Sequence, residues 1–161
     1  IYNKVDPSIP LFVFVVSIIS FLLFIFYKII NNNIRNHDVG NTPNRQGIEL
    51  YSKEFGDDYF SFSLSGVKFL VLNSQIYSDP SQCLDLFDEQ NSWLENQLIE
   101  ANKQGYKHII IFQHIPWFIT APNDADQYFT IPLTRRIPML QLFRKYNVIF
   151  LILFDENVKR K

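Results

Sequence analysis

Polar and apolar residues alternate in the first part of residues 58–74, and the second part is continuously apolar. Alternation with a period of two places successive side chains on opposite faces of a sheet, so the pattern predicts strands at residues 59–64 and 67–72. Ser65 and Gly66 lie between them and suit the tight connection of a β-hairpin. The segment therefore predicts two neighbouring antiparallel strands.

A helix with one apolar face is predicted downstream. Leu94, Leu98 and Ala101 recur at the spacing of one helix face, and Gly105 is placed to end the helix. Residues 108–113, HIIIFQ, then form a short run rich in isoleucine that predicts a strand buried on both faces.

The last third of the chain predicts another helix and strand. Pro138 suits the first turn of this helix. Its apolar side consists of Met139, Leu142, Phe143 and Tyr146. Asn147 should end the helix, and residues 148–154 should form an apolar strand. Strands that alternate with helices indicate an α/β fold, in which reactive groups collect at the carboxyl ends of the strands.

The N-terminal part contains an uncharged apolar run at residues 11–27, LFVFVVSIISFLLFIFY. A spanning helix needs roughly 17 to 25 such residues, so the run predicts a transmembrane helix and a membrane location. A buried core helix is the alternative. A cleaved signal peptide fits less well, because no small-residue cleavage site follows.

Composition narrows the classes of function. The 161 residues suit one domain or part of one. Their net charge of -1, from 15 basic and 16 acidic side chains, argues against a nucleic-acid partner. The single cysteine, Cys83, fits a reducing compartment.

Two short segments carry side chains suited to chemistry. Asn36, His37 and Asp38 follow one another, and His114 comes directly after the predicted strand 108–113. Amide oxygen and imidazole nitrogen are ligands for divalent metals. Taken singly, these residues are more simply read as turn formers and a structural histidine. His108 is interpreted as structural.

The remaining acidic clusters are interpreted as parts of turns. Asp57, Asp58 and residues 124–126 contain carboxylates beside turn-forming residues. We expect these groups to be solvated turn acids and to take no part in catalysis.

An ordered series of blocks resembles the calcineurin-like metallophosphoesterase family. NHDVGNTP resembles the family's Gly-Asn-His-Asp block, and FGDDYFSFSLSGVKFLVLNSQ, QNSWLENQL and IIIFQHIPWF resemble the segments that follow. The resemblance covers residues 36–150. It implies an α/β sandwich of mixed β-sheets flanked by helices, here incomplete and preceded by the added N-terminal hydrophobic helix.

The resemblance also implies roles for four residues. Asn36 and His114 would bind the same one of two divalent metals (Mn, Fe, Zn or Mg), and His37 would contact the phosphate or leaving oxygen. Asp38 would orient His37. The implied activity is hydrolysis of phosphate monoesters by a serine/threonine protein phosphatase acting on a phosphorylated protein or a small phosphate ester. The implied location is the cytoplasm.

The chain departs from the family pattern at several points. The family's upstream Asp-x-His and Gly-Asp blocks and its downstream Gly-His-x-His block are not found, and Arg35 replaces the glycine before Asn36. We therefore expect an incomplete dinuclear site, and no activity from this chain assayed alone with manganese.

Residues 12–34 lengthen the family pattern, and the segment 17–34 consists almost wholly of Ile, Phe, Leu, Asn, Lys, Tyr and Ser, whose codons are mostly rich in A and T. They are interpreted as translated intron, as is the tail after residue 150. The domain prediction is an N-terminal segment at 1–34, a partial phosphoesterase domain at 35–154 and a polar tail at 155–161. The alternatives are a membrane-anchored, non-catalytic relic that acts as a binding surface, and a plain interaction domain.

Overall fold

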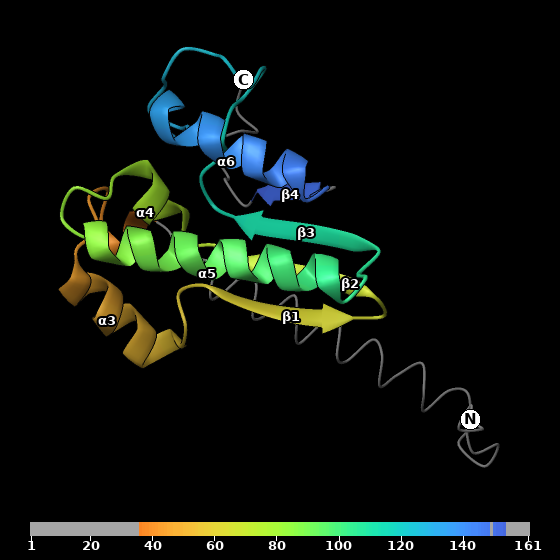
Figure 1. The fold of residues 1–161 in the computed structure, drawn as a ribbon. Coiled ribbons are helices and arrows are strands. Elements are labelled where there is room, and N and C mark those ends of the chain that lie inside the picture. The colour runs from red at the N-terminus through yellow and green to blue at the C-terminus, as the bar shows by residue number, and fades with distance from the viewer. Residues whose placement is uncertain (1–35, 149, 154–161) are drawn as a thin grey trace, which may run out of the picture.

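The computed structural model describes residues 36–148 and 150–153. These residues form one mixed sheet with helices packed against it (Figure 1). In chain order, the elements are α2 (Asn36–Val39), α3 (Arg45–Phe55), β1 (Phe60–Leu64), β2 (Val67–Val71), α4 (Ser74–Ser78), α5 (Leu84–Lys103), β3 (His108–Gln113), α6 (Leu133–Lys145) and β4 (Phe150–Leu153). The predicted α/β class is confirmed.

The sheet has the strand order β1-β2-β3-β4. β1 runs antiparallel to β2, while β2, β3 and β4 are parallel neighbours. The predicted hairpin is confirmed at Ser65 and Gly66, whose φ angles of 51° and 82° are both positive. Two successive positive φ angles match the twist of the flanking strands, and glycine adopts such an angle without steric cost.

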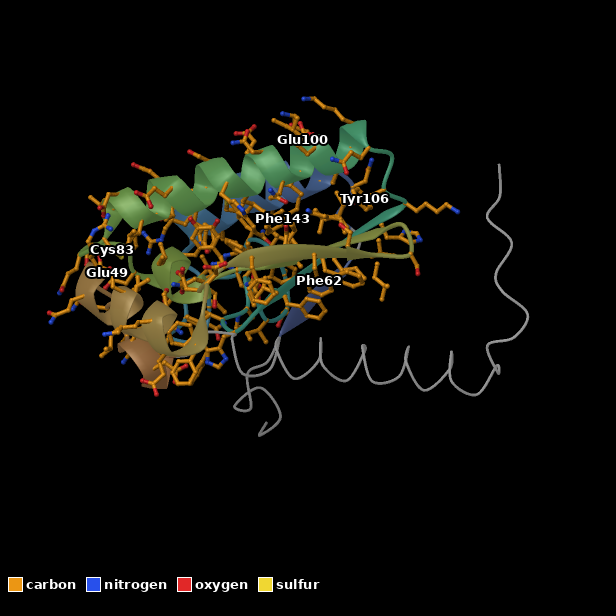
Figure 2. All side chains as sticks on the ribbon, turned by 90° about the horizontal axis from the view of Figure 1, so that it is seen from below. Glu49, Phe62, Cys83, Glu100, Tyr106 and Phe143 are labelled. Atoms are coloured by element: carbon orange, nitrogen blue, oxygen red, sulfur yellow. The ribbon has the colours of Figure 1, made fainter. Side chains whose placement is uncertain are left out.

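One face of the sheet packs against α5 and α6. Leu70 of β2 and Ile111 of β3 are buried with Leu94 and Leu98 of α5 and Phe143 of α6. Figure 2 shows Phe143 on this side of the sheet and Phe62 on the other. The predicted apolar face of α5 is therefore confirmed as the main core contact.

The other face of the sheet is lined by phenylalanines. Phe62 and Phe69 stack with their ring centroids 4.7 Å apart, and Phe69 also stacks on Phe112. Val71 and Phe112 are buried in this cluster, and Phe60 packs against them. None of the described helices contributes a residue to the cluster. Strand alternation explains the division, because neighbouring residues point to opposite faces.

Both long helices that flank β3 end as their sequences predict. After α5, Gly105 has a φ of 71°, and the Tyr106 N–H donates to the Ala101 carbonyl at 3.1 Å. After α6, Asn147 has a φ of 53°, and the next residue donates back in the same way, to the Phe143 carbonyl at 3.0 Å. These bonds satisfy carbonyls that the helix leaves free.

The predicted start of α6 is wrong. Pro138 lies inside the helix, which begins at Leu133. The Leu133 N–H donates to Asp126 Oδ1 at 2.6 Å, so a residue earlier in the preceding loop caps the first turn. Proline is tolerated best in a first turn. The local pattern around Pro138 carried no sign of this more distant cap.

Three helices were not predicted from the sequence. The segment Asn36–Val39, expected to be a loop, forms the helical turn α2, and the expected loop before Pro80 contains α4. α3 begins where the Asn44 side chain accepts from the Gly47 N–H at 2.8 Å. Asparagine is a preferred N-cap residue, so Asn44 was the available signal.

Several predictions fall outside the described residues. These are the membrane helix at 11–27, its intron interpretation, the segment 1–34 and the tail 155–161. Within residues 36–148 and 150–153, no helix combines the length and the apolar character needed to cross a membrane. The predicted strands 59–64 and 67–72 shorten to Phe60–Leu64 and Val67–Val71, and the predicted strand 148–154 is described over Phe150–Leu153.

Candidate functional site

His114 lies directly beyond the carboxyl end of β3, where it is half-buried. Its backbone N–H donates to the Ser74 Oγ at 3.2 Å, and the Ile115 N–H donates to the same oxygen at 2.9 Å. Ser74 is the first residue of α4 and is fully buried. One hydroxyl therefore joins the ends of two parallel strands and fixes the backbone that carries His114.

Ser74 is itself held by a buried amide network. The Asn73 side chain accepts from the Gln75 N–H at 3.1 Å and so caps α4. The Asn73 N–H donates to Gln90 Oε1 at 2.9 Å, and Gln90 Nε2 donates back to the Asn73 carbonyl at 3.1 Å. Because these amides are buried and paired, they fix the start of α4 against α5.

The Asn36-His37-Asp38 segment forms α2, which packs beside α3. Val39, the last residue of α2, packs against a buried cluster that contains Ile76 of α4. The same cluster contains Ile48 of α3, so it groups α2 with both α3 and α4. The backbone of α2 is described, but the positions of the Asn36 and His37 side chains lie outside the described atoms. Asp38 is exposed.

The segment after α2 also reaches the loop that follows His114. Asn41 Nδ2 donates to the Tyr128 hydroxyl at 3.2 Å. Thr42 Oγ1 donates to Asp79 Oδ2 at 2.9 Å, which ties the same segment to the end of α4. The two predicted blocks are distant in sequence, yet hydrogen bonds join the segments beside them.

Asp58 corrects one of the predictions. It is half-buried and accepts from Asn73 Nδ2 at 2.8 Å, so its description as a solvated turn acid is wrong. Burial raises the pKa of the Asp58 carboxyl, while the hydrogen bond from Asn73 opposes part of that rise. Asp58 thus belongs to the amide network below α4, a contact that no local pattern reveals.

The acids between β3 and α6 divide into two kinds. Asp124 accepts from the Thr120 and Ala121 N–H groups at 2.9 and 2.8 Å, and these backbone hydrogen bonds lower the pKa of its carboxyl. Its role as a turn acid is confirmed. Asp126 is exposed, and it forms an ion pair with the buried Arg136 at 3.0 Å.

The fit to a divalent metal rests on His114 alone among the described side chains of the predicted site. No group of three or more His, Cys, Asp or Glu side chains comes together within the described residues to hold a metal ion. A dinuclear centre needs several ligands around each ion. The described residues therefore do not form a metal site by themselves.

His108 provides a contrast within the same strand. It begins β3, is exposed, and lies at the opposite end of the strand from His114. Ligands in α/β sheets bind beyond the carboxyl ends of strands, which places His114 at the reactive edge and His108 away from it.

Comparison with known proteins identifies relatives that are named as phosphatases. The chain is 42% identical over 113 residues to the serine/threonine-protein phosphatase CPPED1 of Danio rerio, which covers 70% of this chain and 37% of that protein. It is 48% identical over 94 residues to the human protein of the same name, covering 58% and 30%. The purple acid phosphatase 13 of Arabidopsis thaliana is 33% identical over 69 residues, covering 43% and 12%.

The similarity to these proteins covers only a part of their length. No protein-family model matches the chain. The chain spans about a third of the length of the curated phosphatases that it matches. The similarity to those phosphatases therefore describes a part of their architecture.

Proposed function

Because the chain belongs to the calcineurin-like metallophosphoesterase family, we propose that it supplies part of the active site of a phosphate-ester hydrolase. The observation that carries the proposal is the 42% to 48% identity to serine/threonine phosphatases. The position of His114 at the carboxyl end of a parallel strand supports it.

Four residues receive roles in this proposal. Asn36 and His114 are the ligands to one metal of a pair, His37 contacts the phosphate or the leaving oxygen, and Asp38 orients His37. Two contacts support their grouping in one site: His114 is hydrogen-bonded to Ser74 of α4, and Val39 packs against the cluster that contains Ile76 of α4. When bound, divalent metals would polarise a phosphoryl oxygen and activate water.

The other metal ligands are assigned to the part of the relatives' length that this chain does not span. The described residues lack a complete metal-binding group, which is consistent with this assignment. The chain assayed alone should therefore hydrolyse no phosphate ester. Manganese-dependent activity from these 161 residues would contradict the assignment.

The substrate class follows from the names of the relatives. Two are named as serine/threonine-protein phosphatases, and the more distant plant relative is named as a purple acid phosphatase. We assign phosphate monoesters on serine or threonine side chains as the substrate. Manganese, iron, zinc and magnesium all accept imidazole and oxygen ligands, so the proposal covers these metals.

The test is hydrolysis of p-nitrophenyl phosphate by the protein produced from the full coding transcript. Addition of manganese should give activity, and a chelator should remove it, because the metals activate the attacking water. Calorimetric titration should show two bound ions per chain. A preparation that binds no metal and hydrolyses no ester would overturn the proposal.

A further inference from the structure

Residues 115–132 connect β3 to α6 and begin directly after His114. The base of this loop is closed by a hydrogen bond from the Ile131 N–H to the Pro116 carbonyl at 3.0 Å. Trp117 and Ile131 are buried in the main core and anchor the two ends. The loop is therefore fixed at its base by both apolar packing and a backbone bond.

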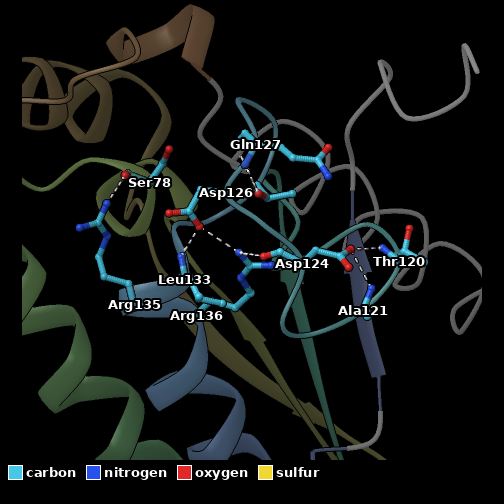
Figure 3. A network of polar contacts seen from close by, with 10 residues as sticks. Ser78, Thr120, Ala121, Asp124, Asp126, Gln127, Leu133, Arg135 and Arg136 are labelled. Carbon is cyan, nitrogen blue, oxygen red and sulfur yellow. Dashed lines mark hydrogen bonds and ion pairs between the residues drawn. The ribbon is translucent and has the colours of Figure 1, made fainter.

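The middle of the loop is held by one buried cation (Figure 3). Arg136 of α6 is fully buried, and its Nη2 donates to the Asp124 carbonyl and to Asp126 Oδ1, both at 3.0 Å. Asp124 in turn accepts from the Thr120 and Ala121 N–H groups. These contacts tie the middle of the loop to α6, which favours a preformed arrangement.

This preformed loop exposes large apolar side chains. Tyr128 is 75% exposed and Phe129 is 45% exposed, and their rings meet edge to face with centroids 5.2 Å apart. Ile119, on the same loop, is also exposed. Exposed aromatic side chains held on a rigid loop are typical of recognition surfaces, because they offer contact area at little entropic cost.

The aromatic pair is linked to a segment next to the candidate site. The loop that carries it begins directly after His114, and the Tyr128 hydroxyl accepts from Asn41, three residues beyond Asp38. A phosphorylated residue that reaches the candidate site would bring its neighbours in the polypeptide past this loop. A small ester would extend no such neighbours toward it.

We propose that Tyr128 and Phe129 bind the apolar side chains next to the phosphorylated residue of a protein substrate. The proposal rests on the proposed function and adds a preference for sequence around the phosphate. The occupant is apolar because the pair presents two aromatic rings, while the Asp124 carboxylate and Asp126 Oδ1 accept hydrogen bonds from N–H donors within the protein.

The test uses the protein produced from the full coding transcript and three probes. Two are nonapeptides with a central phosphothreonine, flanked by leucines in one and by glycines in the other, and the third is p-nitrophenyl phosphate. Phe129→Ala and Tyr128→Ala should each raise KM for the leucine peptide about 5- to 10-fold, with kcat unchanged, because one apolar contact is lost. Values for the glycine peptide and the small ester should not change.

Two matched variants separate recognition from structure. Leu84 is 60% exposed at the start of α5, away from this loop in sequence, so Leu84→Ala should leave all three probes unaffected. Tyr128→Phe retains the ring and loses only the hydroxyl that Asn41 contacts. It should keep most of the preference for the leucine peptide. Equal losses on all three probes, or no loss on any, would overturn the inference.

A binding measurement keeps this inference separate from the proposed function. If the protein hydrolyses none of the probes, the proposed function fails, and fluorescence anisotropy of the labelled leucine peptide decides the role of the loop. Tighter binding by the unaltered protein than by Phe129→Ala would support recognition by the aromatic pair. Equal affinities would refute it.

Discussion

Ser74 is the residue on which the position of His114 depends most, and it acts through its side-chain hydroxyl. It accepts from the N–H groups of His114 and Ile115 at 3.2 and 2.9 Å and is fully buried. Without it, two N–H groups at the end of β3 lose their acceptor. A buried donor without a partner costs free energy comparable to its desolvation.

Ser74→Ala should therefore lower the free energy of unfolding by about 2 kcal/mol, measured by urea denaturation. Ser63→Ala is the control, because Ser63 is exposed on β1, and it should change stability by less than about 0.5 kcal/mol. Equal effects from the two substitutions would show that the Ser74 hydroxyl does not support the His114 backbone.

Asp58 gives a prediction about pH. Burial raises its carboxyl pKa in the folded protein, so folding favours the protonated acid. Its contribution to stability is present below the pKa of the unfolded chain and is lost as pH rises through the raised value. Asp58→Asn keeps an acceptor for Asn73 and removes the charge. The variant should gain stability relative to the unaltered chain between pH 3 and pH 7.

The measurement is urea denaturation of both proteins at pH 3 and pH 7. A stability difference for Asp58→Asn that is the same at both pH values would contradict the buried environment.

Sequence alone located some of these residues and could not locate others. The motif around His114 placed it at the end of a strand, because an isoleucine-rich run is a strong local signal. The burial of Asp58 depends on Asn73, which comes after the whole hairpin. Such contacts arise only when the strands pair, so the local pattern around Asp58 described it wrongly.

The loop between β3 and α6 acts as one element with the first turn of α6. Asp126 Oδ1 accepts from both the Leu133 N–H and the Arg136 guanidinium, and Arg136 is fully buried. Removal of one partner from an ion pair leaves the buried charge uncompensated. The same contact explains why the predicted start of α6 at Pro138 was wrong.

Asp126→Ala should lower the free energy of unfolding by about 2 kcal/mol, less than for a fully buried pair because the Asp126 carboxylate is 57% exposed. Arg136→Met removes the buried charge as well and should cost less than Asp126→Ala. Thermal denaturation of the two variants checks this order. A larger loss for Arg136→Met would show that the guanidinium contributes through its other contacts.

Substitution of two glycines near helix ends should change the free energy of unfolding in opposite directions. Gly105 has a positive φ after α5, so Gly105→Ala should cost about 1 kcal/mol through backbone strain. Gly47 lies inside α3, where a Cβ would meet only ordinary contacts, with Asn44 Oδ1 at 3.5 Å. Gly47→Ala should stabilise by about 0.5 kcal/mol. Changes of the same sign in urea denaturation would contradict the assigned helix ends.

At the scale of the molecule, the described residues form one sheet that is covered by α5 and α6 on one face and carries the phenylalanine cluster on the other. The α/β class and the hairpin were predictable because they depend on local periodicity. α3 and α4 were missed because their signals are single capping residues, Asn44 and Asn73.

The central claim is that His114 belongs to the active site of a phosphoesterase. The most direct measurement is kcat/KM for p-nitrophenyl phosphate with manganese, using the protein from the full coding transcript and its His114→Ala and His108→Ala variants. His114→Ala should lose about 100-fold or more, because the side chain proposed to bind a metal is removed. His108→Ala, at the exposed start of the same strand, should retain full activity. Full activity in His114→Ala, or equal losses in both variants, would contradict the claim.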